Sequence, residues 1–336
     1  MSNLAWRVIT ALIALPLLFW SIWLPTPFLF VGFVILATLF GLVEYFHLAE
    51  KLGFIPFVSI GICGLLGVHG LFYARAIEFL PALLGLLLGA TMVQGVLTER
   101  DFKKSLPSHA ATLHGVVYVG VLCGFLIGLK RLEPPELGSR FLTFFFVVIM
   151  AGDVAAYFVG RAFGRHKLAP LVSPGKTIEG AVGNVGGSLA AAVAVHYGLF
   201  PALPLAHALV LAVVMNIIGQ LGDLYESLLK RGAGTKDAAA VLPGHGGLLD
   251  RLDSLLFNAP VLYYYAQYGL PRPDRGQPQW MFDQDRACRP SPCALAHKTK
   301  HETIHSGGCR DVPRHRLFHR ICLHQQPQPG VHPRAG

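Results

Sequence analysis

Long apolar runs recur from Leu4 to about Leu270, and short polar segments separate them. A helix needs roughly 20 apolar residues to cross the hydrocarbon core of a bilayer, so each run predicts one transmembrane helix. The pattern therefore predicts an all-α polytopic integral membrane protein with about nine transmembrane helices. The predicted spans are residues 4–23, 28–46, 55–73, 78–97, 113–129, 141–158, 178–199, 205–221 and 252–270.

Composition supports a membrane protein over a soluble one. The chain has 336 residues, of which 53% are hydrophobic and 14% are charged, whereas soluble domains carry about a quarter charged residues. The first run is interrupted by Pro16 and lacks an obvious small-residue cleavage site, so we interpret it as a retained helix. With nine spans and a cytoplasmic amino terminus, the basic clusters near residues 100–104, 161–176 and 230–236 fall on the cytoplasmic side.

The pattern divides the chain into three regions. Residues 1–140 are predicted to form a transmembrane scaffold, in which snorkelling or interfacial capping by Glu44, His47 and Glu50 is favoured over a site. Residues 141–270 are predicted to form a catalytic transmembrane region, because carboxylates in membrane helices tend to face a bundle interior or an aqueous cavity. Its polar residues within or beside the spans are Asp153, Tyr157, Glu179, Asn184, Asn216, Gln220, Asp223 and Glu226.

Residues 271–336 have a different composition, rich in His, Arg, Pro and Cys, and are predicted to be a disordered tail. Cys288 and Cys293 stand in a C-x4-C spacing that matches no standard zinc finger. Zinc binding is an alternative interpretation of this tail. A shifted reading frame at the end of the gene is a further hypothesis, which the abrupt change of composition motivates.

The segment Ser173–Gly180, SPGKTIEG, is the first candidate for chemistry. Pro174 and Gly175 predict a turn, and Lys176 supplies a mobile cation that Glu179 is close enough to orient. Such a loop at a helix start can hold phosphate through backbone N–H groups. The segment lacks the G-x-x-x-x-G-K-[ST] pattern of a Walker A loop. A polar turn that only caps the next helix is the alternative interpretation.

Residues 219–231 are predicted to continue one helix out of the membrane. Glu226 and Lys230 lie four residues apart and can form an ion pair on its surface. Asp223 stands nearer the apolar span and must have a partner there.

Residues 243–253, PGHGGLLDRLD, place glycines before a predicted helix. Gly246 and Gly247 let the backbone approach a ligand closely. Asp250 and Asp253 lie three residues apart on one face, and two such carboxylates repel unless positive charge lies between them. A divalent cation, for which Mg²⁺ suits an oxygen-rich site, is one solution, and neutralisation by Arg251 is the other.

The run SLLKRGAGTKDAAAVLPGHGGLLDRLD, from Ser227 to Asp253, resembles the signature of the phosphatidate cytidylyltransferase (CDP-diacylglycerol synthase) family. The segment at Ser173–Gly180 and the residues Gly152, Asp153 and Tyr157, followed by GRAFGRHKLAP, also look like that family. The resemblance covers about residues 1–270. It implies a bacterial enzyme of the cytoplasmic (inner) membrane that converts CTP and phosphatidic acid into CDP-diacylglycerol and pyrophosphate.

The resemblance further implies Mg²⁺ dependence with a K⁺-assisted cation site, a homodimer, an active site at the cytoplasmic face, and no nucleic-acid partner. By position, Asp223 and Asp250 would hold the cations with help from Asp253. The residues expected to act in catalysis are Asp223, Lys230, Lys236, Asp250 and Asp253. Those expected to bind substrate are Ser173, Lys176, Thr177, Glu179, Arg231, Asp237, His245, Gly246, Gly247 and Arg251.

Two other functions are weighed against this one. Another CTP-using membrane transferase, such as a polyprenol kinase relative or an archaeal-lipid cytidylyltransferase, is disfavoured by the HGG-x2-DR-x-D block. A transporter would also contain many spans and intramembrane acids, but transporters often contain internal repeats, and the sequence shows no repeat.

Overall fold

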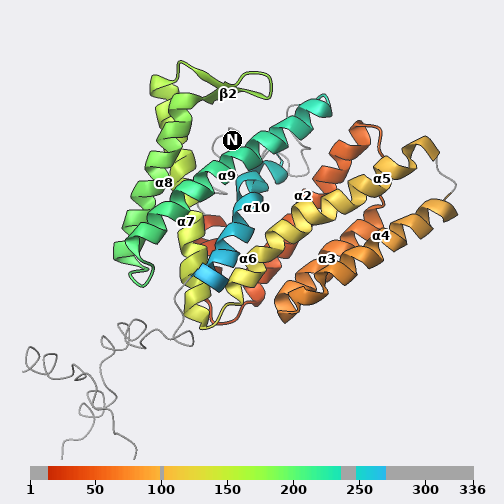
Figure 1. The fold of residues 1–336 in the computed structure, drawn as a ribbon, viewed down its shortest axis with the longest axis horizontal. Coiled ribbons are helices and arrows are strands. Elements are labelled where there is room, and N and C mark those ends of the chain that lie inside the picture. Colours follow the sequence, from red (N-terminus) through yellow and green to blue (C-terminus); the bar gives the residue numbers. More distant parts are fainter. Residues whose placement is uncertain (1–13, 99–101, 236–246, 270–336) are drawn as a thin grey trace, which may run out of the picture. The chain divides into compact units, whose positions relative to one another are not determined.

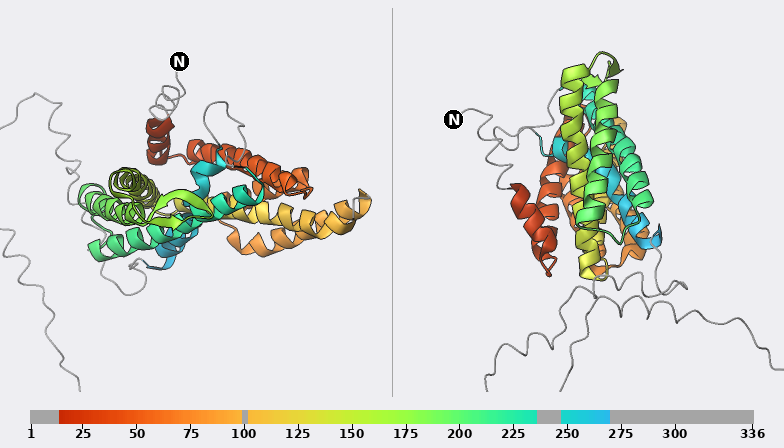
Figure 2. Two further views of the ribbon diagram at one scale, coloured as in Figure 1. Left: turned by 90° about the horizontal axis from the view of Figure 1, so that it is seen from above. Right: turned by 90° about the vertical axis from the view of Figure 1, so that its left-hand side faces the viewer.

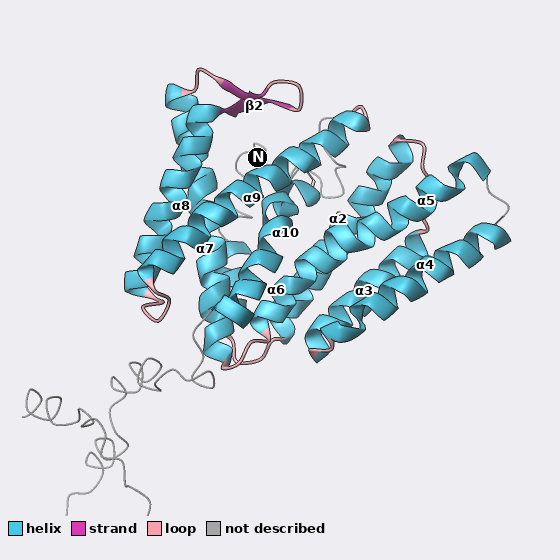
Figure 3. Ribbon diagram, in the orientation of Figure 1, coloured by secondary structure: helices cyan, strands magenta, loops and turns pink. Residues whose placement is uncertain are grey.

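The computed structural model describes residues 14–98, 102–235 and 247–269, and these are almost entirely helical (Figures 1 and 3). Among them, six helices are long and apolar enough to cross a membrane, and Ala14–Trp23 and Val58–Ala74 are shorter apolar helices. A helical segment occupies each of the nine predicted spans in the described residues. The predicted class, an all-α polytopic membrane protein, is confirmed. The predicted tail lies outside the described residues.

The first half of the chain forms a group of packed helices. Its long helix from Phe102 to Lys130 combines α5, η2 and α6 without a break, and η2 is a π-helical turn. Figure 1 shows α3 and α4 beside α5 and α6. The elements are α2 (Phe28–Lys51), α3 (Val58–Ala74), η1 (Ile77–Phe79), α4 (Leu80–Leu97), α5 (Phe102–Gly115), η2 (Val116–Val121) and α6 (Leu122–Lys130).

The second half contains the long helices α7 and α8 and the contacting pair α9 and α10. Helices α7 and α8 lie side by side in both Figures 1 and 2, and α9 packs against α8 and α10. Helix α10 also contacts α2 and α6, so it joins the two halves. The elements are α7 (Pro135–Phe163), β1 (Lys167–Ala169), β2 (Ser173–Thr177), α8 (Ile178–Gly198), α9 (Leu205–Gly232), α10 (Leu249–Tyr264) and η3 (Tyr265–Gly269).

The predicted turn at Pro174 and Gly175 is wrong, because these residues belong to strand β2. Strand β2 pairs antiparallel with β1, with Lys167 opposite Thr177 and Ala169 opposite Ser173, so the chain reverses earlier, between the strands. A two-stranded sheet has only edge strands, and an edge strand tolerates proline because one row of N–H groups needs no partner. Lys176 therefore lies on strand β2 of the β1–β2 hairpin.

Small residues bring α7 and α8 into close contact. A Cβ added to Gly183 would lie 2.6 Å from Val159, and one added to Gly187 would lie 2.7 Å from the Ala151 carbonyl oxygen. Van der Waals packing of this kind drives helix association in membranes, where lipid offers no hydrophobic driving force. One continuous set of buried side chains contains residues of both halves, including Phe30, Phe145 and Leu256. The division near residue 140 stays a prediction.

Candidate active site

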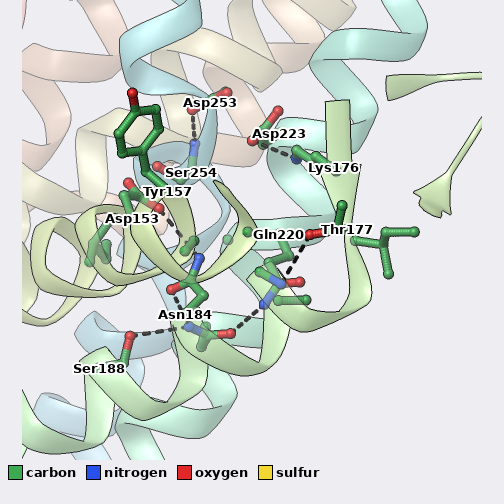
Figure 4. A pocket seen from close by; sticks show the side chains of 18 of the residues that line it. Asp153, Tyr157, Lys176, Thr177, Asn184, Ser188, Gln220, Asp223, Asp253 and Ser254 are labelled. Atoms are coloured by element: carbon green, nitrogen blue, oxygen red, sulfur yellow. Dashed lines mark hydrogen bonds and ion pairs between the residues drawn. The ribbon is translucent and has the colours of Figure 1, made fainter. Parts of the chain in front are cut away.

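A cavity of about 660 Å³ opens between α7, β2, α8, α9 and α10. Figure 4 shows that acidic and amide side chains from four of these elements converge there. These elements follow one another along the chain. Helices α7 and α8, with β2 between them in sequence, form one wall of the cavity, and α9 and α10 form the other. Its lining includes four carboxylates, a lysine and an amide from the two walls: Asp153, Lys176, Asn184, Asp223, Asp250 and Asp253.

An ion pair connects the two walls of the cavity. Lys176 Nζ of β2 lies 2.5 Å from Asp223 Oδ2 of α9 (Figure 4). This pair provides the partner that the sequence required for Asp223. The expectation that Glu179 orients Lys176 is not met, because the carboxyl of Glu179 binds elsewhere.

Glu179 instead joins the two ends of the β1–β2 hairpin. Its carboxylate accepts hydrogen bonds from the backbone N–H of Arg165, at 3.1 Å, and of His166, at 3.2 Å. The His166 ring nitrogen Nδ1 lies 2.6 Å from Glu179 Oε1. Thr177 Oγ1 accepts a hydrogen bond from Gly180 N and so caps α8, as expected for a polar residue before a helix. These contacts fix the strand that carries Lys176.

Close packing of α9 on α10 sets the position of Asp253. A Cβ on Gly222 would lie 2.5 Å from the Asp253 carbonyl oxygen, so only glycine fits at this crossing. The Asp253 residue is 9% exposed, and its Oδ1 accepts a hydrogen bond from Ser254 N at 2.5 Å. Asp223, next to Gly222 in α9, consequently stands beside Asp253 at the same cavity.

A second cation bridges α9 and α10. Lys230 Nζ lies 2.5 Å from Glu226 Oε2, which confirms the predicted i,i+4 pair, and it also donates a hydrogen bond to Asp250 Oδ1. Gly247 N donates to the other oxygen, Asp250 Oδ2, at 3.2 Å. Burial alone raises the pKa of the Asp250 carboxyl, but its contacts with neighbouring groups, Lys230 and Gly247 N among them, outweigh burial and hold that pKa below its ordinary value.

Amide side chains form the deep part of the cavity. Asn216 Nδ2 donates to Asn184 Oδ1 at 2.5 Å and to Ser188 Oγ at 3.1 Å. Gln220 Nε2 donates to Asn216 Oδ1, and Asn184 Nδ2 donates to Asp153 Oδ1 at 3.4 Å. The sequence marks the three amides as polar residues within apolar spans but assigns none of them to the site. It gives no indication of Ser188, because a serine in an apolar helix carries no distinctive signal.

The structure brings only some of the predicted site residues to the cavity. Lys176, Thr177, Asp223, Asp250 and Asp253 line it. Lys230 and Gly247 reach it through Asp250. Ser173, Glu179, Arg231 and Arg251 do not line it: Arg231 Nε donates to the Val172 carbonyl oxygen, and Arg251 is exposed. Lys236, Asp237, His245 and Gly246 lie outside the described residues.

The prediction that Glu44 snorkels is wrong, and its capping contact is made to the buried start of α10. Glu44 is 0% exposed, and its Oε2 accepts a hydrogen bond from Leu249 N at 2.8 Å. The side chains of His47 and Glu50 are about half exposed and lie 3.7 Å apart, and the interpretation stays a prediction for these two residues. The sequence could not separate these three residues, because all of them lie near the end of one apolar span.

The carboxylates that line the cavity are ligands of the type that Mg²⁺ prefers. Asp153, Asp223, Asp250 and Asp253 line one cavity with their hard carboxylate oxygens, which Mg²⁺ prefers, and this ion usually completes its shell with water and substrate phosphates. In the part of the chain that the structure describes, no three His, Cys, Asp or Glu residues are close enough to hold an ion by themselves. An ion at this cavity would therefore need further oxygen ligands, such as those of water or a phosphate.

Comparison with known proteins gives one family. The sequence profile of the cytidylyltransferase family matches residues 5–269 of this chain. The matched region contains the cavity and every described helix, and it ends where the described residues end.

Curated relatives match over much of the same region, and several of them are named phosphatidate cytidylyltransferase. The Staphylococcus saprophyticus protein is 35% identical over 268 residues, which are 76% of this chain and 96% of the relative. The Brucella suis protein is 34% identical over 282 residues, which are 79% and 94%. The Bacillus subtilis protein is 40% identical over 150 residues, which are 44% of this chain and only 54% of the relative.

Proposed function

This chain belongs to the cytidylyltransferase family of nucleotidyltransferases, and we propose that it is a phosphatidate cytidylyltransferase. The proposed reaction converts CTP and phosphatidate into CDP-diacylglycerol and pyrophosphate in phospholipid biosynthesis. The observation that carries the proposal is the joint placement of Lys176, Asp223, Asp250 and Asp253 at one cavity among membrane-length helices. The names of the relatives support the same activity.

The proposed chemistry is a direct in-line displacement. A phosphate oxygen of phosphatidate attacks the α-phosphorus of CTP, the bond from that phosphorus to the bridging oxygen breaks, and pyrophosphate leaves with the electron pair. The nucleophile is anionic near neutral pH, so the step needs alignment and charge neutralisation more than a strong base. The main barrier is repulsion between a lipid anion and a polyanionic nucleotide.

The positive charges of two lysines near the cavity would reduce this repulsion. Lys176 and Lys230 each hold an aspartate, Lys176 across the two walls and Lys230 between α9 and α10, so each cation is fixed before substrate arrives. Fixed charges in a protein site stabilise developing negative charge without reorganisation at the moment of reaction. We infer that these lysines exchange part of their carboxylate contact for phosphate oxygens when CTP binds.

Mg²⁺ is the proposed cofactor, with K⁺ as an accessory cation. Asp223, Asp250 and Asp253 would hold it together with substrate phosphate oxygens. The bound ion would neutralise charge on the CTP phosphates and on the leaving pyrophosphate. The three aspartates come from both α9 and α10, so cation binding would also depend on the packing of these helices.

The proposed location is the cytoplasmic face of the bacterial inner membrane, and the proposed assembly is a homodimer. CTP is a cytosolic solute, so the cavity must open to the cytosol, while the acyl chains of phosphatidate stay among the lipids. The basic residues near the β1–β2 hairpin and near the end of α9 favour a cytoplasmic location of these segments under the positive-inside rule.

The experiment that tests the function uses purified full-length protein in phosphatidate-containing vesicles with labelled CTP. With ³²P at the α-position, the label should enter a CDP-lipid, whereas γ-labelled CTP should release labelled pyrophosphate. Vesicles that contain diacylglycerol in place of phosphatidate serve as the matched control and should give no product. Transfer of the γ-label to lipid would identify a kinase, and absence of any CDP-lipid in replete vesicles would refute the assignment.

A further inference from the structure

The capping residue of α10 makes no side-chain hydrogen bond to the helix start. Leu248 occupies the capping position in helical conformation, and its side chain makes no cap hydrogen bond. The first N–H groups of a helix have no partner within the helix, so a buried helix start needs acceptors from elsewhere. Asp250, which lines the cavity, stands in this first turn.

The missing acceptor comes from α2, 205 residues earlier in the chain. Glu44 Oε2 accepts a hydrogen bond from Leu249 N at 2.8 Å, and the same carboxyl interacts with the N–H of Leu248. Glu44 is 0% exposed, and its Oε1 has no hydrogen-bond partner.

The same face of α2 fixes α10 by packing. Gly41 precedes Glu44 by three residues, and a Cβ on Gly41 would lie 3.3 Å from Leu252 Cδ1 and 3.9 Å from Leu249 Cδ1. Leu249 and Leu252 are buried. The hydrogen bond and this apolar contact flank Asp250, which faces Lys230 and the cavity.

We propose that Glu44 is a positioning residue for the reaction: from the scaffold half of the chain, it caps α10 and holds Asp250 in register with Lys230 and the cavity. The inference rests on the proposed function for its meaning in catalysis. It assigns to α2 a role in the site that neither the family resemblance nor the motif at Ser227–Asp253 indicates. Glu44 touches no substrate and acts through Leu249.

Three variants of Glu44 test whether the length of its side chain or its charge matters for the cap. In Glu44→Gln, an acceptor oxygen stays within reach of Leu249 N, so most of the wild-type kcat should remain. In Glu44→Asp, the charge stays but the side chain is one methylene shorter, so kcat should fall well below that of Glu44→Gln. In Glu44→Ala, the cap is lost, and kcat should fall about 100-fold, as expected when a reacting group is displaced by about 1 Å. KM for CTP should change little in all three.

Hydrogen exchange provides a readout that needs no substrate. The amides of residues 248–250 should exchange faster in Glu44→Ala and Glu44→Asp than in wild type, and at the wild-type rate in Glu44→Gln. Glu50→Ala is the matched control on α2, because the Glu50 side chain is 52% exposed, and it should change neither exchange nor kcat.

The outcomes decide between this inference and others. Wild-type kcat in Glu44→Ala, or a higher kcat in Glu44→Asp than in Glu44→Gln, would overturn it. A raised KM with unchanged exchange would also overturn it, because that result assigns Glu44 to substrate binding. If Glu44→Ala does not fold, the comparison of Asp with Gln still decides. If wild-type protein makes no CDP-lipid, the proposed function fails, while the exchange of residues 248–250 still tests the cap.

Discussion

Lys176 Nζ and Asp223 Oδ2 lie 2.5 Å apart and join the strand before α8 to the carboxyl-terminal half of α9. The two residues are 47 positions apart in the chain (223 − 176). Figure 4 shows the pair beside the acidic and amide side chains of the cavity. This ion pair thus connects the SPGKTIEG segment to α9, the helix in which the Ser227–Asp253 motif begins.

Replacement of Lys176 should strongly reduce turnover. Lys176→Met removes the cation and leaves Asp223 without its partner, so kcat/KM for CTP should fall about 100-fold or more, the size seen when one charge-stabilising group is lost. Steady-state kinetics with phosphatidate vesicles measures it. Lys167→Met is the matched control, because Lys167 is exposed on β1 of the same hairpin and does not line the cavity. Equal effects of both substitutions would contradict a specific role for Lys176.

Asp250→Asn should abolish turnover while the fold remains assembled. The change keeps the shape of the side chain but removes the charge that Lys230 and Gly247 N hold in place. The thermal unfolding midpoint in detergent should stay within a few degrees of wild type, since the residue lies at a helix end. Glu136→Gln, an exposed change in the first turn of α7, is the control and should keep full activity. Near-normal activity of Asp250→Asn would refute its proposed role.

Gly222→Ala should damage both stability and activity. Alanine normally stabilises a helix by about 1 kcal/mol relative to glycine. At position 222 the new methyl would lie 2.5 Å from the Asp253 carbonyl oxygen, and overpacking of this kind costs roughly 1–3 kcal/mol. Thermal unfolding and the vesicle assay both report the effect.

Gly186→Ala is the matched control for that change. A Cβ at Gly186 meets nothing within 4 Å in α8, so the helix preference of alanine acts alone. The control should be as stable as wild type or slightly more so. Equal behaviour of the two variants would show that the α9–α10 crossing tolerates a side chain.

Removal of divalent cations should stop the reaction. Excess EDTA should abolish CDP-lipid formation, and added Mg²⁺ should restore it. Asp253→Asn should raise the Mg²⁺ concentration needed for half-maximal rate by about 10-fold, a typical loss when a residue that supports a metal site is changed. Full activity in EDTA would rule out the proposed cofactor.

The pattern of apolar residues predicts most of the helices of this fold, and the reason is physical. Only helices satisfy every backbone group in a lipid environment without a closed barrel, so apolar runs of the right length translate directly into helices. The ends of these helices are less predictable. The apolar pattern predicts a span over residues 141–158, but α7 runs from Pro135 to Phe163. By contrast, the predicted continuation of one helix through residues 219–231 is confirmed, because α9 extends to Gly232, where its polar face contacts the β1–β2 hairpin and α10.

The sequence by itself determined that this chain is a helical membrane protein and that its charged residues gather in two motifs, because apolar length and charge position are local properties. Only the tertiary structure decided which charges meet across different elements. It paired Lys176 with Asp223 rather than Glu179, brought Asp250 to Lys230, and buried Glu44 against Leu249. These partners are separated along the chain, and a buried charge takes the partner that packing brings within reach.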